Sequence, residues 1–343
     1  MKSVLIGMSG GVDSSVAAAI LKEKGYKVIG ATMKLWHGNS DSNINDAKAV
    51  CEKLGIEFIT LNCQEEFKKR VIDYFINEYT HGRTPNPCIV CNKYLKFGAM
   101  LDKAIEMGID YVATGHYARI EKDSDGKYML RVSDAAKKDQ SYFLYNFTQE
   151  KLARTLMPLG EYNKEWVREK ARELGLNVAD KSDSQEICFV EDDDYAKFIR
   201  EYSGYVPREG DIFDINGNVI GTHKGLIYYT IGQRKGIGAY GRPMFVMKID
   251  SDKNAITLGE KGMEFSNELT ASNVNFISGD FPKKSILVSA KVRYGAKPAE
   301  CMICPMENGR VKVMFPEPQR AVTPGQAVVF YDGDVILGGG TVD

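Results

Sequence analysis

The sequence lacks the features that mark membrane, secreted and strongly basic proteins. It has no apolar run long enough to span a bilayer, and its first residues, "MKSVLIGMSGG", lack the cleavage site of a signal peptide and are typical of a strand. Its net charge is −1, from 45 basic and 46 acidic residues, which argues against nucleic-acid binding through overall charge, although a local stripe of Lys and Arg can still bind phosphates. Its seven cysteines, an odd number, favour a reducing cytosol. We therefore expect a cytoplasmic protein with no membrane partner.

The composition is that of an ordinary protein with two or three domains: 343 residues, 43% hydrophobic and 27% charged. In the first third, buried strands alternate with helices that are closed by glycine. Strands are expected at 2–8, 27–33, 56–61 and 111–113, and helices at 13–24 and 45–54. This alternation predicts an α/β fold with a doubly wound parallel sheet, in which ligands bind at the carboxyl ends of the strands.

The last third has a different character. Asn216-Gly217 predicts a hairpin, and from about Leu269 the chain reads as short strands separated by turns at Asn308-Gly309 and Asp332-Gly333. This pattern is typical of a small closed or sandwiched β-domain. We expect three domains, at 1–200, 201–267 and 268–343.

The segment "MSGGVDSS" (residues 8–15) lies directly between the first predicted strand and the first predicted helix. Gly10 and Gly11 permit a tight turn that directs backbone N–H groups towards an anion. The segment is not a Walker A loop, because the lysine of that motif is absent. It predicts a phosphate-binding loop, and a glycine-rich turn capped by serines is the structural alternative.

A second segment, "TPNPCIVCNKYLKF" (residues 84–97), places two cysteines three residues apart behind two prolines. Helical spacing of apolar residues resumes at about Asn92, so Cys88 and Cys91 are expected at or just before a helix N-terminus, where the thiolate is favoured. The pair is consistent with two small buried side chains, a metal or cluster site, a redox pair or a sulfur nucleophile.

Further strings carry a family resemblance. Ser9–Ser14 resembles the S-G-G-x-D-S loop of the N-type ATP pyrophosphatases, which cleave ATP between the α and β phosphates. The strings that follow in order are "GRTPNPCIVCNKYLKF", "ATGHYAR" (113–119), "KKDQSYFL" (137–144), "SQEICF" (184–189), "YYTIGQRKGIG" (228–238) and "VRYG" (292–295). Together they resemble the tRNA-specific 2-thiouridylase family, MnmA, over essentially the whole chain.

The resemblance implies a reaction and an architecture. The reaction is sulfur insertion at C2 of the wobble uridine, position 34 of certain tRNAs, after ATP adenylates the uridine oxygen. The implied cofactors are ATP and Mg²⁺, and the implied partners are the tRNA anticodon loop and an upstream sulfur-carrier or cysteine desulfurase protein. The implied architecture is an α/β ATP domain, a small central domain and a C-terminal β-barrel.

The resemblance also assigns residues. ATP binding is implied for Gly7, Met8, Ser9, Gly10, Gly11, Val12, Asp13, Ser14, Met33 and Gly115, with Asp13 also catalytic. Cys188 is implied to carry a persulfide, and Cys91 to resolve it by releasing sulfide or by forming a Cys91–Cys188 disulfide. Target-base contact is implied for Asn86, Pro87 and Cys88. Contact with tRNA is implied for Lys138, Asp139, Gln140, Arg293 and Tyr294. From its aromatic side chain alone, Tyr142 is expected to offer a further stacking surface.

One position departs from part of the family, in which some members carry Asp where this sequence has Cys88. With Cys91 and Cys188 it makes three thiolates, enough to hold a [4Fe–4S] cluster with one open iron that binds sulfide. This route is the alternative to a persulfide.

Two other functions compete with tRNA thiolation. One is an enzyme of the same phosphate-loop superfamily that adenylates a small metabolite, which would leave Cys88, Cys91 and Cys188 without a role. The other is an iron–sulfur or zinc-binding regulatory protein with a vestigial ATP site. Pyrophosphate release with and without unmodified tRNA separates the three.

Overall fold

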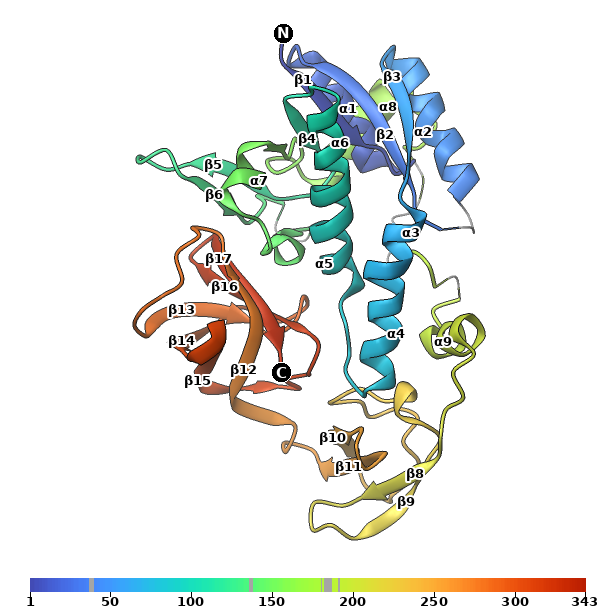
Figure 1. The fold of residues 1–343 in the computed structure, drawn as a ribbon, viewed down its shortest axis with the longest axis vertical. Coiled ribbons are helices and arrows are strands. Elements are labelled where there is room, and N and C mark those ends of the chain that lie inside the picture. Colours follow the sequence, from blue (N-terminus) through green and yellow to red (C-terminus); the bar gives the residue numbers. More distant parts are fainter. Residues whose placement is uncertain (37–39, 136–137, 180, 182–186, 191) are drawn as a thin grey trace.

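The computed structural model describes residues 1–36, 40–135, 138–179, 181, 187–190 and 192–343. It contains a parallel α/β domain, a small central sheet and a β-barrel, in that order along the chain (Figure 1). None of the helices in these ranges is long and apolar enough to cross a membrane.

The N-terminal sheet has five parallel strands in the order β3-β2-β1-β4-β7. They are β1 (Ser3–Gly7), β2 (Lys27–Lys34), β3 (Glu57–Asn62), β4 (Tyr111–Ala113) and β7 (Thr155–Leu156). The order reverses between β1 and β4, so the loops after these two strands border the crevice in which such sheets bind ligands. The predicted doubly wound sheet is confirmed.

Helices cover both faces of this sheet, which explains why the core residues of β1 are apolar without alternation. One apolar cluster joins the sheet to α1 (Val12–Glu23), α2 (Ser40–Leu54) and α8 (Lys164–Glu173). A second cluster joins the other face to α6 (Met100–Glu106) and α7 (Gln149–Ala153).

Two long helices contain π-helical segments that the sequence pattern does not predict. The first runs through α3 (Gln64–Phe67), η1 (Lys68–Ile72) and α4 (Asp73–Thr80), and the second through α5 (Pro87–Cys91), η2 (Asn92–Ala99) and α6. In the second, the buried positions 91, 95, 100 and 104 include one step of five residues, which a π turn accommodates. This helix begins at Pro87, earlier than the apolar spacing predicts, so Cys88 and Cys91 lie inside it.

The central sheet has the order β10-β11-β8-β9 and its own apolar cluster. Its strands are β8 (Gly210–Phe213), β9 (Val219–His223), β10 (Met244–Asp250) and β11 (Ala255–Glu260). The predicted hairpin is present: Asp214 Oδ1 accepts the N–H groups of Asn216 and Asn218, and Gly217 has φ +85°.

The C-terminal strands form a closed antiparallel barrel of six strands. They are β12 (Phe265–Phe276), β13 (Ile286–Lys291), β14 (Ala299–Pro305), β15 (Val311–Arg320), β16 (Ala327–Asp332) and β17 (Val335–Val342). The β12–β17 pairing closes the barrel, and the predicted barrel is confirmed. The shorter elements elsewhere in the chain are η3 (Ser141–Leu144), α9 (Tyr195–Ser203), η4 (Leu226–Tyr228) and η5 (Glu307–Gly309).

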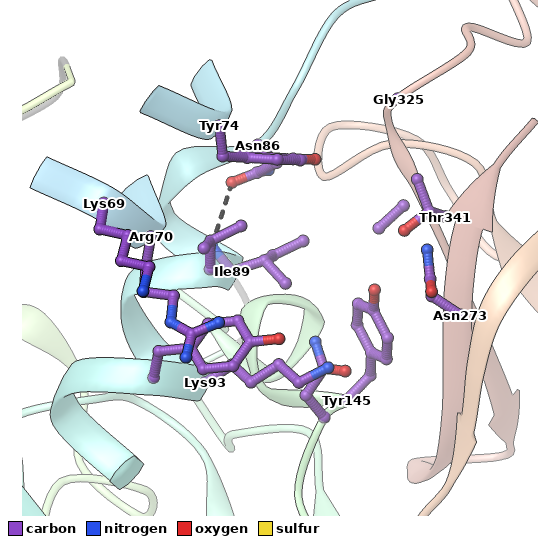
Figure 2. A pocket seen from close by; sticks show the side chains of 14 residues that line it. Lys69, Arg70, Tyr74, Asn86, Ile89, Lys93, Tyr145, Asn273, Gly325 and Thr341 are labelled. Atoms are coloured by element: carbon purple, nitrogen blue, oxygen red, sulfur yellow. Dashed lines mark hydrogen bonds between the residues drawn. The ribbon is translucent and has the colours of Figure 1, made fainter. Parts of the chain in front are cut away.

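The α/β domain and the barrel are joined by a shared sheet and a shared core. The hairpin of β5 (Arg119–Lys122) and β6 (Tyr128–Arg131) extends the barrel sheet, because β6 pairs with β17. Elsewhere the two domains face each other across a cavity of about 330 Å³ (Figure 2).

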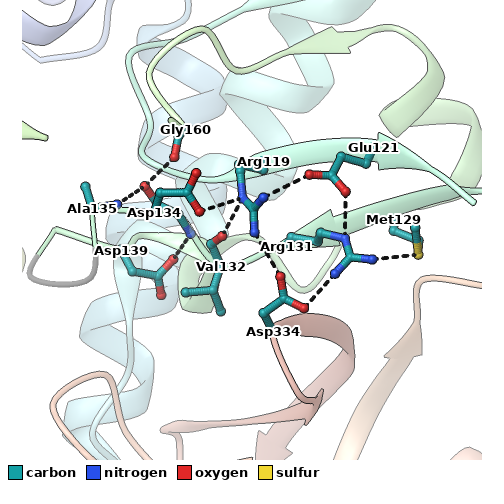
Figure 3. A network of polar contacts seen from close by, with 11 residues as sticks. Arg119, Glu121, Met129, Arg131, Val132, Asp134, Ala135, Asp139, Gly160 and Asp334 are labelled. Carbon is teal, nitrogen blue, oxygen red and sulfur yellow. Dashed lines mark hydrogen bonds and ion pairs between the residues drawn. The ribbon is translucent and has the colours of Figure 1, made fainter. Parts of the chain in front are cut away.

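A network of charged side chains fixes this junction (Figure 3). Asp334 is the turn residue directly before β17. It accepts hydrogen bonds from Arg119 Nη2 at 2.8 Å and Arg131 Nη1 at 2.6 Å. Glu121 pairs with both arginines at 3.0 and 2.9 Å. The two arginines belong to the hairpin and Asp334 to the barrel, so the network holds the domains in one orientation.

We expect Asp334→Asn to weaken this junction. The change keeps the side-chain shape and removes the charge that assists two hydrogen bonds, so a loss of about 1 kcal/mol is expected for these partly exposed pairs. For a chain of this size, that loss lowers the melting temperature by about 2 °C in calorimetry. Asp332→Asn, at the exposed last residue of β16, is the matched control, and equal melting temperatures for the two variants would contradict the prediction.

Candidate active site

The phosphate loop lies at the carboxyl end of β1, as the sequence predicts. Gly11 precedes α1 in an extended conformation (φ −104°, ψ 167°), and none of the described side chains caps the first turn of the helix. The backbone N–H groups of that turn are therefore available to an anion. Ser9 and Ser14 brace the loop, since Ser14 Oγ accepts from the Ser9 N–H at 3.2 Å.

Two glycines make this geometry possible. Gly10 has φ +70°, and a Cβ there would lie 2.6 Å from the carbonyl oxygen of Asn43. Gly115, after β4, approaches α1 so closely that a Cβ would lie 2.7 Å from the Ser14 nitrogen. The loops after β1 and β4 therefore meet at the crevice, and their donor groups fit a polyphosphate.

The end of β2 borders the same crevice. Met33 is the penultimate residue of β2 and is partly buried against the apolar clusters around it. The neighbouring Thr32 donates from Oγ1 to the Met8 carbonyl at 2.8 Å, which ties the phosphate loop to β2. The structure thus brings together all the residues predicted to bind ATP, and their contact with ATP stays a prediction.

Asp13 is held by two residues that sequence reasoning missed. Lys164 Nζ lies 2.7 Å and 2.8 Å from its two carboxylate oxygens, and Tyr117 donates its hydroxyl to Asp13 Oδ1 at 2.7 Å. Lys164 begins α8, and its side chain is 9% exposed. The string "ATGHYAR" contains Tyr117, but no sequence signal connects Lys164 with a loop 151 residues away.

A second missed cation faces the loop. Lys181 Nζ donates to the Gly10 carbonyl at 3.2 Å, to Asn43 Oδ1 at 2.9 Å and to Asp46 Oδ2 at 2.8 Å. These contacts hold Lys181, seven residues before Cys188 in the sequence, at the phosphate loop. The predicted string 184–189 is only partly visible here, since residues 182–186 lie outside the described residues, as does Lys137 of another string.

The cysteines gather around α5. Asn86 caps this helix by accepting the Ile89 N–H at 3.4 Å, and Pro87 occupies its first turn. Cys91 is buried in an apolar cluster that also contains Phe189, the neighbour of Cys188. The Cys88 and Cys188 side chains reach the surface, but protein atoms crowd around their sulfur atoms and desolvate them.

The pKa values of these thiols are raised, which corrects the expectation of a favoured thiolate. Burial raises the pKa of Cys91 to about 11. Burial, followed by the neighbouring Cys91 and Cys88 thiols, raises the pKa of Cys188 to about 12. Burial also raises the pKa of Cys88. The dipole of a five-residue helix does not overcome the desolvation of the sulfur atoms.

Phe189, the neighbour of Cys188, packs in the same buried cluster as Cys91, so these two parts of the chain meet although they are far apart in sequence. Within the described ranges, no three His, Cys, Asp or Glu side chains are arranged to hold a metal ion.

Lys96 connects the thiols to the nucleotide crevice, and sequence reasoning missed it as well. Its charge lowers the pKa of all three thiols, against the larger effect of burial. The pKa of His116 lies well below its ordinary value. The larger cause is burial of the imidazole, and the second is the positive charge of Lys96. His116 follows Gly115 and bonds through Nδ1 to Thr114 Oγ1 at 2.7 Å.

The residues predicted to contact tRNA meet where the barrel touches the α/β domain. Tyr294, 42% exposed, donates its hydroxyl to the Asp139 carbonyl at 3.0 Å. Gln140 accepts the Tyr117 N–H at 3.1 Å, and Arg293 donates to the Arg320 carbonyl at 3.3 Å. The structure thus brings the loop at 138–140 beside Arg293 and Tyr294.

Two side chains in this region serve the fold. The Asp139 carboxylate is buried and accepts from the Ser133 and Ser141 backbone N–H groups at 3.1 and 3.2 Å. Tyr142, expected as a stacking surface, is fully buried and donates to the Ala327 carbonyl at 2.9 Å. The expectation for Tyr142 is wrong, because its ring packs in the core between the two domains.

Comparison with known proteins agrees with this arrangement. Family models match the tRNA methyl transferase HUP domain at residues 2–192, the tRNA methyl transferase PRC-barrel domain at 196–260 and the aminomethyltransferase β-barrel domain at 266–342. The chain is 54% identical over 355 residues to the tRNA-specific 2-thiouridylase MnmA of Acetivibrio thermocellus, covering 99% of each protein. It belongs to the MnmA family.

Other members are equally similar. MnmA of Clostridioides difficile strain 630 is 53% identical over 354 residues, with 100% of this chain and 98% of that protein covered. Among solved structures, a 4-thiouridine synthetase–RNA complex with bound ATP is 19% identical, covers 55% of this chain and 45% of its own, and has a TM-score of 0.38. The family resemblance predicted from the ordered strings is confirmed.

Proposed function

We propose that this protein is an ATP-dependent tRNA 2-thiouridylase that replaces O2 of the wobble uridine, position 34, with sulfur. The observation that carries the proposal is the phosphate loop at the start of α1, which the loop after β4 meets through the close approach of Gly115. A phosphate loop in a chain that also carries sulfur nucleophiles suits a reaction that joins adenylation to thiolation. Membership of the MnmA family supports the same reaction.

The first half of the reaction activates the base. ATP supplies an adenylyl group that turns O2 of uracil into a leaving group, and Mg²⁺ accompanies its phosphates. The N–H groups at the start of α1 bind the phosphates, and Gly115 and Met33 border the adenosine. Asp13 accepts from Lys164 and Tyr117, so it holds the Lys164 charge beside the pyrophosphate that leaves.

The second half transfers sulfur. Cys188 receives a terminal sulfur from an upstream sulfur-carrier protein as a persulfide. That sulfur attacks C2 of the base, and the bond from C2 to the AMP oxygen breaks. The Cys91 sulfur then attacks Cys188 Sγ, which leaves sulfur on the base and forms a Cys91–Cys188 disulfide. A thiol reductant returns two electrons to the disulfide before the next turnover.

The persulfide route is preferred over a [4Fe–4S] cluster. The alternative, a [4Fe–4S] cluster held by Cys88, Cys91 and Cys188, differs from it in needing all three thiols. In the persulfide route Cys88 has no covalent step and, with Asn86 and Pro87, borders the target base.

The experiment that tests the function measures two products. Unmodified tRNA, ATP and a persulfide donor are mixed with the protein, pyrophosphate is measured with and without tRNA, and 2-thiouridine is measured by mass spectrometry of digested tRNA. We expect both products only with tRNA. Pyrophosphate release stimulated by a small metabolite instead would contradict the proposal.

Binding of tRNA is expected to depend steeply on salt, although the net charge of the chain is −1. Counterions are released wherever clustered cations meet phosphates. Arg293→Ala is expected to flatten the slope of log K against log salt by about one. Lys283→Ala, on the connection between β12 and β13, is a control with an exposed lysine of the barrel. An unchanged slope for Arg293→Ala would place this part of the barrel away from the RNA.

A further inference from the structure

The cavity between the α/β domain and the barrel has the chemistry of a nucleotide site. Its charged lining residues are Lys69, Arg70 and Lys93, and none of the described residues that line it is acidic (Figure 2). Arg70 also pairs with Glu66 at 2.9 Å, and both lysines line the cavity. A cavity whose charged lining is entirely cationic selects an anion.

An aromatic ring stands among these cations. The Arg70 guanidinium lies over the Tyr94 ring, 4.9 Å from its centroid, and the Lys93 ammonium lies 5.3 Å from the same centroid. The ring is still 36% exposed. Cations beside an exposed aromatic face are the combination by which proteins bind a phosphate together with an unpaired base.

The other walls supply groups that can read a base edge. Asn146 contributes from the α/β domain, and Asn273 contributes from β12. Asn273 adopts φ +50° at an irregularity in the β12–β17 pairing, which sets it apart from the regular strand. At about 330 Å³ the cavity is at the small end of ligand pockets, roughly 300–1,000 Å³, which suits one nucleotide better than a stem.

The cavity is separate from the thiols. Asn86, Ile89 and Val90 line it at helical spacing, whereas neither Cys88 nor Cys91 does. The site is therefore about one helix diameter, roughly 10 Å, from the sulfur chemistry. That distance suits a nucleotide adjacent in the strand to the base being thiolated.

We propose that this cavity binds a nucleotide of the tRNA that neighbours the target uridine, with its phosphate at Lys69 and Lys93 and its base at Tyr94. The inference rests on the proposed function. The tRNA is favoured over a free nucleotide because the walls come from both the helix that carries the thiols and the barrel, which the RNA must touch together. It is favoured over an acidic protein because the site is a small concave opening and not a broad face.

The test uses the full chain and unmodified tRNA. Lys69→Gln/Lys93→Gln is expected to raise the Kd for tRNA about tenfold and to reduce the slope of log K against log salt by about 0.7–0.9 for each lost phosphate contact. Tyr94→Leu is expected to raise the Kd by a similar factor with an unchanged slope, because stacking releases no counterions. Lys48→Gln, on α2 with a side chain 60% exposed, is the matched control and is expected to match the wild type in both.

Four outcomes decide the proposal, with ATP affinity and melting temperature measured for each variant. The two different signatures in Lys69→Gln/Lys93→Gln and Tyr94→Leu, with unchanged ATP affinity and melting temperature, support it. An unchanged Kd and slope in the lysine variant overturn it. Weaker ATP binding with unchanged tRNA binding overturns it in favour of a free nucleotide. A defect only in sulfur delivery by the donor protein overturns it in favour of protein docking. The wild-type products test the proposed function independently, because tRNA binding is measured without catalysis.

Discussion

Cys91→Ser and Cys188→Ser are each expected to eliminate 2-thiouridine while tRNA-dependent pyrophosphate release continues at close to the wild-type rate. Cys91 packs with Phe189, the neighbour of Cys188, and in the proposed route loss of either thiol removes the sulfur carrier or the group that resolves it. Adenylation depends on the phosphate loop and Asp13, which neither substitution touches. The two measurements are mass spectrometry of digested tRNA and a coupled pyrophosphate assay in the same reaction.

Two further serine variants sharpen this result. Cys301→Ser, at a buried thiol of the barrel strand β14, is the matched control and is expected to thiolate normally. Cys88→Ser separates the two sulfur routes: it is expected only to slow thiolation if a persulfide operates, and to abolish it if a cluster is used. If both Cys91→Ser and Cys188→Ser still thiolate tRNA, the assignment of the sulfur site is wrong.

Asp13→Asn is expected to lower tRNA-dependent pyrophosphate release by at least about 100-fold, the usual effect of removing one preorganised electrostatic group. Asp13 fixes Lys164 at the phosphate loop, and the amide cannot hold that charge in the same way. The measurement is the initial rate of pyrophosphate release at saturating tRNA.

The buried position of Lys164 adds a second expectation. Without the carboxylate, its buried ammonium loses the charge pair with Asp13, so the melting temperature of Asp13→Asn is expected to fall. Asp13→Asn/Lys164→Met removes both charges and is expected to recover stability without recovering the rate. Glu23→Gln, at the opposite end of α1 with a 52% exposed side chain, is the control. A wild-type rate in Asp13→Asn would remove Asp13 from the reaction.

The fold was predictable from the sequence where the local pattern agrees with the tertiary environment. The strand at 111–113 was predicted with its observed ends, because a buried strand after a helix-closing glycine has a clear local signal. The π segment at 92–99 could not be predicted, because a single step of five residues in an apolar pattern is easily taken for a loop boundary. The union of β6 with β17 was also missed, because residues so far apart in sequence leave no local trace of their pairing.

The candidate site divides along the same line. Gly10, Gly11 and Asp13 share one short loop with a recognisable order, so they could be found from the sequence. Lys164 and Lys96 could not, because a lysine on a helix is ordinarily a solvated side chain and only the tertiary structure turns it towards a carboxylate or a thiol. The thiol pKa values were predicted in the wrong direction because the helix start was visible in the sequence and the surrounding apolar cluster was not.

The shared core between the α/β domain and the barrel limits how this architecture can be recombined. Val329, Tyr331 and Ile336 of the barrel belong to the same buried cluster as Leu5 of β1. A barrel transplanted onto another protein would carry that apolar surface uncovered, along with the edge of β17 that β6 now occupies. The barrel is therefore not an interchangeable module, and it can change only together with the hairpin and the helices that cover it.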